Sequence, residues 1–132
     1  MSRVFPFISV DGAKDAIELY KQAFNAEVVG EITTYEEFFP DHPDKDNIAH
    51  AALSIGGSPL FIGDAKDQPY KDQVRVTVNV ELPTIESVQK SFSVLQKEAR
   101  EVFYEPCDVG WSELGYSLRD QYGILWMVYY RK

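Results

Sequence analysis

Cysteine, histidine and basic residues are scarce in this 132-residue chain, and long hydrophobic runs are absent. The lone Cys107 cannot form a disulfide within the chain, which excludes a disulfide-stapled scaffold and fits a reducing compartment. No apolar run approaches the roughly 20 residues that cross a bilayer, and no apolar stretch typical of a signal peptide follows the first residues. We therefore expect a cytoplasmic protein with no membrane partner.

The shortage of positive charge excludes a further class. Lys and Arg number 13 against 21 Asp and Glu, which gives a net charge of -8. This charge repels phosphate backbones and argues against nucleic acid as a partner, whereas it favours a cationic or neutral ligand. Hydrophobic residues make up 45% and aromatic residues 14% of the chain, enough for one packed domain and too much for a disordered protein.

The first half of the chain predicts a strand, a helix and three further strands. β-branched and aromatic residues crowd Val4–Val10, and apolar residues at helical spacing begin at Ala13, with Asp11 as the expected N-cap. A long acidic loop over 36–49 carries Phe38 and Phe39, and its length indicates a lid as an alternative to a solvated loop. The later strands are expected at 27–35, 50–55 and 59–63, the last two joined by a hairpin at Gly56-Gly57-Ser58.

The second half repeats this order. Valines alternate with polar residues over Val74–Val80, which is typical of a strand with one buried face, and Thr84 is expected to cap a helix. Strands are expected at 101–105, 116–119 and 124–130. Two βαβββ modules, at 1–65 and 73–132 with a linker at 66–72, predict an α+β fold within a single domain. We expect a curved mixed sheet with helices on its convex side and a concave cleft.

Four short segments carry a family resemblance. They are Val10-Asp11-Gly12-Ala13, the helix start over 16–24, His50-Ala51-Ala52-Leu53-Ser54-Ile55-Gly56-Gly57 and the closing Asp120-Gln121-Tyr122-Gly123-Ile124-Leu125-Trp126. In this order they resemble the glyoxalase, bleomycin-resistance and extradiol-dioxygenase superfamily (vicinal oxygen chelate fold), and within it the PhnB-like branch. The resemblance implies a small-molecule ligand and a homodimer, sometimes with exchanged segments.

Metal-using members of that superfamily hold a divalent ion with four side chains, usually His, Glu or Gln. Carried over by strand register, the four positions are Phe5, Ala52, Arg75 and Met127, none of which suits a hard or borderline cation. Only His42 and His50 could supply imidazole ligands, and their spacing does not bring them together. We therefore predict no metal and no cofactor, and the sequence also lacks the usual nucleotide-binding and hydrolase motifs.

Alternation along the strands predicts the side chains that line the cleft. On the first strand Ile8 and Val10 should face the helix, which turns Phe5, Phe7 and Ser9 the other way. A pocket of this kind suits an aromatic or charged small molecule, because rings stack on rings and Arg75 suits an anion. The predicted ligand-binding residues are Phe5, Phe7, Phe38, Phe39, His50, Phe61, Arg75, Trp111, Met127 and Tyr129.

Three functions follow from this pattern. The leading one is a metal-free small-molecule-binding protein that sequesters its ligand, similar to bleomycin-resistance members of the superfamily. The second is a lyase-like or dioxygenase-like enzyme in which His50 acts as acid, base or unconventional ligand. The third is a structural or regulatory dimer whose cleft is filled by its own aromatic side chains. Cys107 is interpreted as an inert loop thiol in each case.

Overall fold

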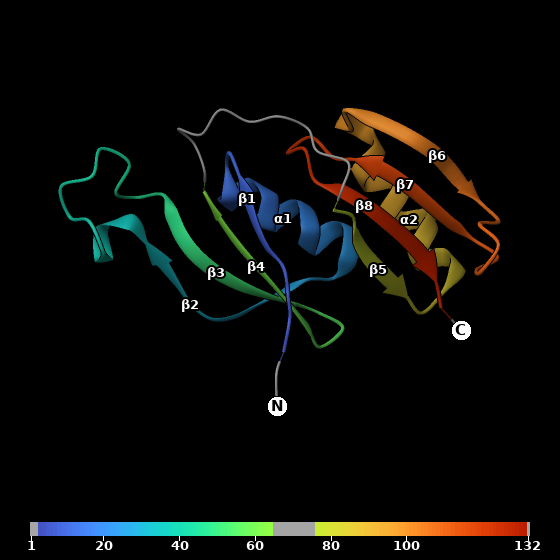
Figure 1. The fold of residues 1–132 in the computed structure, drawn as a ribbon, viewed down its shortest axis with the longest axis horizontal. Coiled ribbons are helices and arrows are strands. Elements are labelled where there is room, and N and C mark those ends of the chain that lie inside the picture. Colours follow the sequence, from blue (N-terminus) through green and yellow to red (C-terminus); the bar gives the residue numbers. More distant parts are fainter. Residues whose placement is uncertain (1–2, 65–75, 132) are drawn as a thin grey trace. The chain divides into compact units, whose positions relative to one another are not determined.

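The computed structural model describes residues 3–64 and 76–131. The chain divides into two compact units, the first made of Met1–Lys21 and Asn25–Gln68, the second of Gln22–Phe24 and Pro69–Lys132. The order strand, helix, three strands occurs twice, and each half builds a four-stranded mixed sheet (Figure 1). The α+β fold with two βαβββ modules is therefore confirmed. The expected linker at 66–72 lies outside the described residues.

The sheet of the first unit has the strand order β1-β4-β3-β2, with β1 parallel to β4 and the other pairs antiparallel. The β3–β4 hairpin turns at Gly56 and Gly57, whose φ angles of 58° and 89° lie in the left-handed region that favours glycine, as the sequence predicts. The elements of this half are β1 (Phe7–Val10), α1 (Ala13–Phe24), β2 (Glu27–Thr34), the short 3-10 helix η1 (Tyr35–Glu37), β3 (Ile48–Ile55) and β4 (Ser58–Asp64).

One face of this sheet is core and the other is not. The strands bury alternate residues, so Ile8 and Val10 are buried while Phe7 and Ser9 are exposed, and the alternation expected for β1 is confirmed. The apolar stripe of α1 is buried as well. The core side chains of the sheet in this unit are Ile8, Val10, Ala51, Leu53, Leu60 and Ile62.

The start of α1 is held by a residue from β4. Asp11 was expected as its N-cap, and this prediction is wrong: the N-cap is Gly12, in a left-handed conformation without a side-chain cap. The Asp64 carboxylate instead accepts hydrogen bonds from the backbone N–H groups of Gly12 (3.1 Å), Ala13 (2.8 Å) and Ile48 (2.8 Å). One side chain at the end of β4 therefore ties together the beginnings of α1 and β3.

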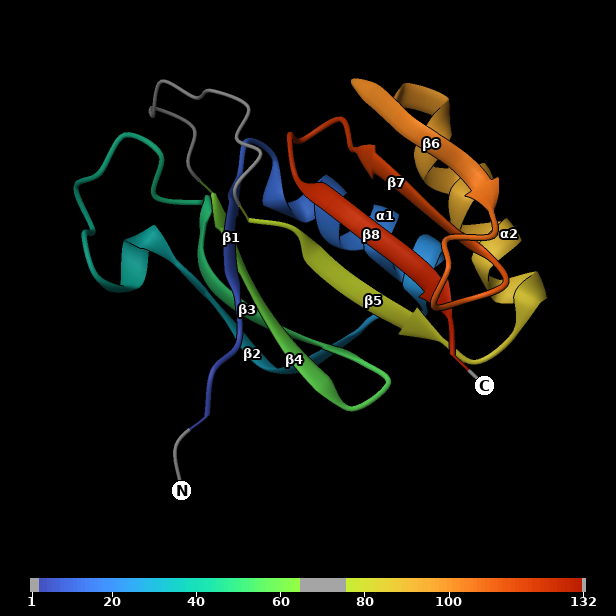
Figure 2. The same ribbon diagram turned by 45° about the vertical axis from the view of Figure 1, so that its right-hand side comes forward.

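The sheet of the second unit has the order β5-β8-β7-β6, with β5 parallel to β8, and Figure 2 shows α2 along one of its faces. Thr84 caps α2 as predicted, since its hydroxyl accepts a hydrogen bond from the Ser87 backbone N–H at 3.0 Å. The elements are β5 (Val78–Leu82), α2 (Ile85–Leu95), η2 (Gln96–Glu98), β6 (Glu101–Cys107), β7 (Gly115–Arg119) and β8 (Leu125–Tyr130).

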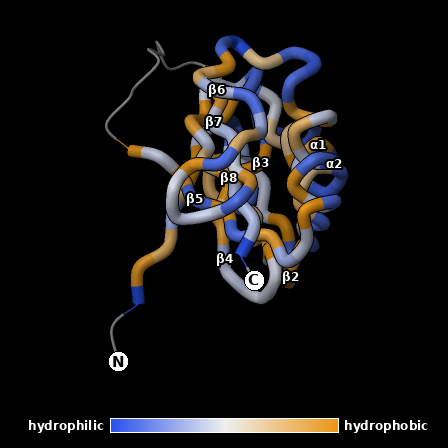
Figure 3. Tube along the Cα trace, turned by 90° about the vertical axis from the view of Figure 1, so that its right-hand side faces the viewer, coloured by the Kyte–Doolittle hydropathy of each residue, from blue (hydrophilic) through white to orange (hydrophobic). Residues whose placement is uncertain are grey.

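The core of the second unit lies between its sheet and α2. Apolar and polar residues alternate along the helix (Figure 3), and its buried Ser91 shares a 2.8 Å hydrogen bond with the hydroxyl of Tyr116. Burial raises the pKa of Tyr116 well above its ordinary value, so this hydroxyl stays protonated. Trp126 is fully buried, donates from its indole N–H to Asp120 at 2.7 Å and lies with its ring 5.0 Å from that of Phe24.

One expected strand is shorter than the valine pattern suggests. The valine alternation over Val74–Val80 predicts a buried face that includes Val76, but β5 begins at Val78 and Val76 is exposed, so this prediction is wrong for Val76. Val80 and Leu82 carry the buried face instead, because only the residues paired with β8 are held in its register.

Among the described residues, no helix has the length and apolar character that crossing a membrane requires.

The capping role of Asp64 predicts an asymmetry between two nearby aspartates. Asp64→Asn should lower the free energy of unfolding by about 1 to 3 kcal/mol, because the amide NH₂ cannot accept from a backbone N–H. Asp11→Asn should cost less than about 0.5 kcal/mol, since Asp11 is exposed and caps nothing. Urea unfolding followed by circular dichroism measures both, and equal losses would contradict the assigned cap.

Candidate functional site

Four rings form a continuous cluster on the side of the first unit's sheet that faces away from its core. We call this surface, made of Phe5, Phe7, His50 and Phe61, the aromatic face. The ring of Phe61 lies 4.6 Å from that of Phe5 and 4.6 Å from that of His50, both edge to face, and His50 lies 6.1 Å from Phe7. The structure therefore brings together all four aromatic residues that the sequence assigns to this half, apart from the loop pair Phe38 and Phe39.

Strand pairing accounts for this gathering. Phe7 on β1 pairs directly with Phe61 on β4, and Phe61 pairs with Ala52 on β3, so a small side chain leaves room beside the ring. Gly63 has a similar effect: a Cβ built there would lie 2.7 Å from the Ala49 carbonyl oxygen and 3.0 Å from Cζ of Phe7. The Phe7 ring therefore lies over a residue that must be glycine.

The aromatic face is partly open to solvent. Phe7 is 50% exposed and Val29, which pairs with Ala52 on the next strand, is 54% exposed, while the other rings are half-buried. A contiguous group of partly exposed apolar side chains is a candidate surface for binding another molecule. The guanidinium of Arg3 lies 5.4 Å from the centroid of the Phe5 ring, which adds a positive charge at the border of the cluster.

His50 contributes a ring with two nitrogens available for hydrogen bonding. Its backbone carbonyl accepts a hydrogen bond from the Thr33 hydroxyl at 3.3 Å, which fixes the strand position. Within residues 3–64 and 76–131, neither imidazole nitrogen of His50 takes part in a hydrogen bond. The ring is therefore held by contacts with Phe7 and Phe61, and its polar atoms can bond to a ligand.

The loop phenylalanines lie apart from the aromatic face. Phe38 and Phe39 are largely exposed, and in the described part of the chain neither makes a ring contact with the four-ring cluster. Phe39 instead lies near His42, whose ring is 5.2 Å from Tyr35 and whose Nδ1 accepts from the Asp44 backbone N–H. His42 thus organises its own loop, and the lid stays a prediction.

In the second unit, the predicted residue Met127 is packed by its neighbours. It is only 6% exposed, and its sulfur accepts a hydrogen bond from the Tyr104 hydroxyl at 3.1 Å. A Cβ built at Gly115 would lie 3.0 Å from the Met127 methyl group, so the methionine side chain also lies over a glycine. Contacts from its own chain therefore cover Met127, and Arg75, predicted beside it, lies outside the described residues.

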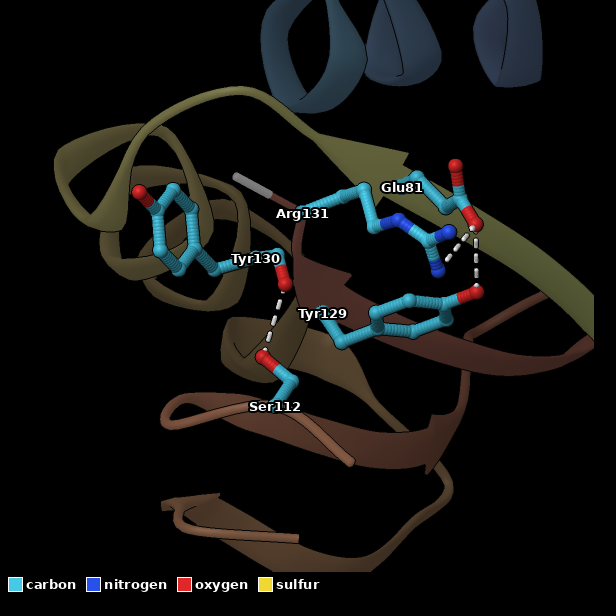
Figure 4. Close-up of polar contacts among 5 residues, drawn as sticks. All are labelled: Glu81, Ser112, Tyr129, Tyr130 and Arg131. Carbon is cyan, nitrogen blue, oxygen red and sulfur yellow. Dashed lines mark hydrogen bonds and ion pairs between the residues drawn. The ribbon is translucent and has the colours of Figure 1, made fainter. Parts of the chain in front are cut away.

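Tyr129 and Trp111 form a second group in this unit. The Tyr129 hydroxyl donates to Glu81 Oε1 at 2.8 Å, and Nη1 of Arg131 lies 3.6 Å from the same oxygen (Figure 4). Burial and the hydrogen bond to Glu81 raise the pKa of Tyr129, so its hydroxyl remains a donor at neutral pH. The Trp111 ring lies 6.0 Å from that of Tyr129 at 84°, an edge-to-face contact.

The side chains that the family resemblance assigns to the metal positions are poor ligands for a metal ion. Phe5 and Ala52 have no lone pairs, and the Met127 sulfur suits only soft metals and already accepts from Tyr104. Elsewhere in the described ranges, no three His, Cys, Asp or Glu side chains gather in a way that could hold a metal. We therefore derive no reaction step through a metal for this chain.

Sequence reasoning missed three residues that shape these surfaces. Glu81 follows Asn79 by two positions on the polar side of β5, so strand alternation could have indicated it. Gly63 shows its importance only through the close approach of Phe7 and of the Ala49 carbonyl. Tyr104 could not be found in this way, because the register of β6 shifts on both sides of it and alternation fails there.

Comparison with known proteins supports this architecture. The family model described as Glyoxalase/Bleomycin resistance protein/Dioxygenase superfamily matches residues 4–128, whereas no curated protein matches the chain. The structure is similar to a PhnB protein from Bacillus cereus, with a TM-score of 0.80 at 20% identity over 98% of this chain and 100% of that chain. It is also similar to PA1353 from Pseudomonas aeruginosa, with a TM-score of 0.78 at 20% identity over 99% and 98%.

A more distant likeness is to the fosfomycin resistance protein FosX from Listeria monocytogenes, crystallised as a mutant with Mn(II) and 1S,2S-dihydroxypropylphosphonic acid. Its TM-score is 0.68 at 10% identity, over 99% of this chain and 93% of that one. At these identities the likeness to solved structures shows the fold alone, whereas the family model spans both modules. The chain belongs to the Glyoxalase/Bleomycin resistance protein/Dioxygenase superfamily.

Proposed function

We propose that this chain is a small-molecule-binding protein that holds a ring-bearing ligand on the aromatic face without a bound metal. The observation that carries the proposal is the unbroken contact from Phe5 through Phe61 and His50 to Phe7, with Phe7 half exposed. The core of this unit lies on the opposite face of the sheet, so these rings are not needed to fill it. A surface of this kind is available for recognition.

The arrangement of the rings favours a planar ligand. Phe61 meets both of its neighbours edge to face, and such contacts leave ring faces and edges on which another ring can pack. Each aromatic pair contributes about 0.5 to 1.5 kcal/mol beyond the burial of area. The net charge of -8 further favours neutral or cationic ligands over anionic ones.

Donor chemistry separates this proposal from metal-dependent activity. The FosX structure contains Mn(II), which needs oxygen or imidazole ligands. The four carried-over positions in this chain offer two hydrocarbon side chains, Phe5 and Ala52, the guanidinium of Arg75 and the thioether of Met127. None of these groups supports chelation of Mn(II), so we infer binding by ring contact instead.

A second function, an enzyme that uses His50 as acid or base, is favoured by one observation. The imidazole lies within the aromatic face, and its nitrogens form no hydrogen bond inside the described ranges. A proton acceptor or donor in that position could act on a ligand stacked against Phe7 or Phe61. In the leading function, by contrast, His50 acts mainly as a ring that contacts the ligand.

We include a homodimer in the proposal. Edge strand β2 exposes Val29 and Ile32, and edge strand β6 exposes Val102 and Phe103. Open sheet edges with apolar side chains are commonly covered by pairing with a second chain. The self-filled alternative is supported only in the second unit, where Tyr104 packs on Met127.

Removing the central ring should weaken ligand binding. Phe61→Leu keeps an apolar side chain but loses both edge-to-face contacts, so we expect binding of the neutral planar fluorophore prodan to weaken about tenfold, or 1.4 kcal/mol. The blue shift of prodan emission measures the affinity. Phe103→Leu, a matched change at an exposed phenylalanine of β6, should leave it unchanged. Equal effects of the two substitutions would show nonspecific adsorption and contradict the proposed site.

Two substitutions separate the contribution of the His50 ring from that of its hydrogen-bonding nitrogens. His50→Phe keeps a ring between Phe7 and Phe61, so prodan affinity should stay within about threefold of the unmodified chain, whereas His50→Ala should weaken it more. The same fluorescence titration measures both. If His50→Phe costs as much as His50→Ala, the imidazole nitrogens contribute directly, and the enzyme alternative gains support.

Metal content provides an independent check. Protein purified without a histidine tag should contain far less than one equivalent of Zn, Mn or Fe by inductively coupled plasma mass spectrometry, because the donors at the superfamily's positions cannot hold these ions. Binding of prodan should also be insensitive to EDTA. A tightly held stoichiometric metal would overturn the metal-free proposal.

A further inference from the structure

We propose that Glu81, Tyr129 and Trp111 form a second binding site, for a planar organic cation in which an amidinium or guanidinium group is attached to an aromatic ring. The site lies within the second unit, so it goes beyond the proposed function and does not depend on the aromatic face. The site combines three groups: the carboxylate of Glu81, which is held in place, the exposed indole of Trp111, and the weakly paired guanidinium of Arg131, which a ligand cation can replace.

The carboxylate is positioned by the hydroxyl of a tyrosine whose ring is packed on the sheet. Glu81 and Tyr129 are register partners on the parallel strands β5 and β8, and the tyrosine hydroxyl donates to Glu81 Oε1 at 2.8 Å. The tyrosine residue is only 9% exposed, so its ring is fixed against the sheet and carries the hydroxyl to the exposed Glu81. Glu81 Oε2 has no partner within the described residues. The negative charge is therefore fixed at one oxygen and open to solvent at the other.

The indole is exposed although its chain segment is anchored. Trp111 is 63% exposed, and its edge-to-face contact with Tyr129 leaves much of the ring accessible. The next residue, Ser112, is buried and donates to the backbone carbonyl of Tyr130 at 2.7 Å, as Figure 4 shows. The Val109 backbone N–H donates to the Ser112 carbonyl at 3.1 Å. A tryptophan on an anchored turn binds with a smaller loss of conformational entropy than a mobile one.

Arg131 shows which chemistry the carboxylate accepts. Its guanidinium Nη1 lies 3.6 Å from Glu81 Oε1, yet the side chains of Arg131 and Glu81 are 67% and 50% exposed. An exposed ion pair of this length contributes little to stability. A ligand that brings its own planar cation and an aromatic ring can displace Arg131 at small cost and gain contact with the indole.

The chemistry of the three groups selects this class of ligand. Tryptophan is the strongest cation–π partner among the side chains, and guanidinium and amidinium groups are planar, weakly hydrated and able to bond a carboxylate. The raised pKa of Tyr129 keeps its hydroxyl a donor to Glu81 rather than a competing anion. The net charge of -8 adds long-range attraction for any cation.

Benzamidine and its neutral analogue benzamide test the proposal. The chain has two tryptophans, and Trp126 is fully buried, so a ligand at the site should alter the emission of Trp111. We expect a saturable change with benzamidine and none with benzamide at equal concentration. Glu81→Gln should weaken benzamidine binding about tenfold or more, and Arg131→Gln should strengthen it severalfold, because it removes the competing cation.

Two matched variants separate this site from general electrostatics. Glu98→Gln and Lys97→Gln make the same changes of charge at exposed positions of η2 and should leave benzamidine affinity within about twofold. Tyr129→Phe removes only the hydroxyl that holds Glu81 and should weaken binding less than Glu81→Gln. Circular dichroism confirms that each variant is folded.

Three outcomes would overturn the proposal: no saturable response to benzamidine, equal binding of benzamide, or equal effects of Glu81→Gln and Glu98→Gln. None of them bears on the aromatic face, because prodan carries no charge and its test depends on Phe61. Conversely, loss of the Phe61 effect would leave the benzamidine result standing. The two sites therefore fail or succeed separately.

Discussion

The Asp64 carboxylate holds the first unit in the geometry on which its surface depends. Two oxygens of one side chain accept from three backbone N–H groups, two at the start of α1 and one at the start of β3. Since β1 runs directly into α1, these bonds also fix the end of β1 against β4, the parallel pair that places Phe7 opposite Phe61. A shift of β1 by one residue against β4 would turn Phe7 toward the core and away from Phe61.

The two sheets share a strand order but use their second faces differently. In the first unit, Ala52 and Gly63 are small neighbours that leave the Phe7 and Phe61 rings spread across the sheet and partly open. In the second unit, the Met127 side chain occupies the space that a side chain at Gly115 would need, and the Tyr104 hydroxyl donates a hydrogen bond to the methionine sulfur. The same backbone arrangement thus gives an open aromatic surface in one half and a packed one in the other.

Patterns that depend on neighbouring residues predicted most of the fold. Alternation placed Ile8 and Phe7 on opposite faces, and the Gly56-Gly57 turn and the Thr84 cap needed only local chemistry. The cap of α1 could not be predicted, because Asp64 lies 52 residues from Gly12 and only the fold brings them together. Tyr104 could not be predicted either, because register shifts interrupt the alternation of β6 on both sides of it.

The proposed character of the candidate site depends on the side chains that the family resemblance assigns to the metal positions. Chelation depends on a few directional lone pairs, which the side chains of Phe5 and Ala52 do not supply. Ring contact depends on area and shape, so it tolerates ligands that differ in substituents as long as a flat surface is presented. In the proposed sites, the few polar atoms near the rings then determine which ligands are selected. On the aromatic face these are the His50 nitrogens, and in the second unit the Glu81 carboxylate has the corresponding place beside Tyr129 and Trp111.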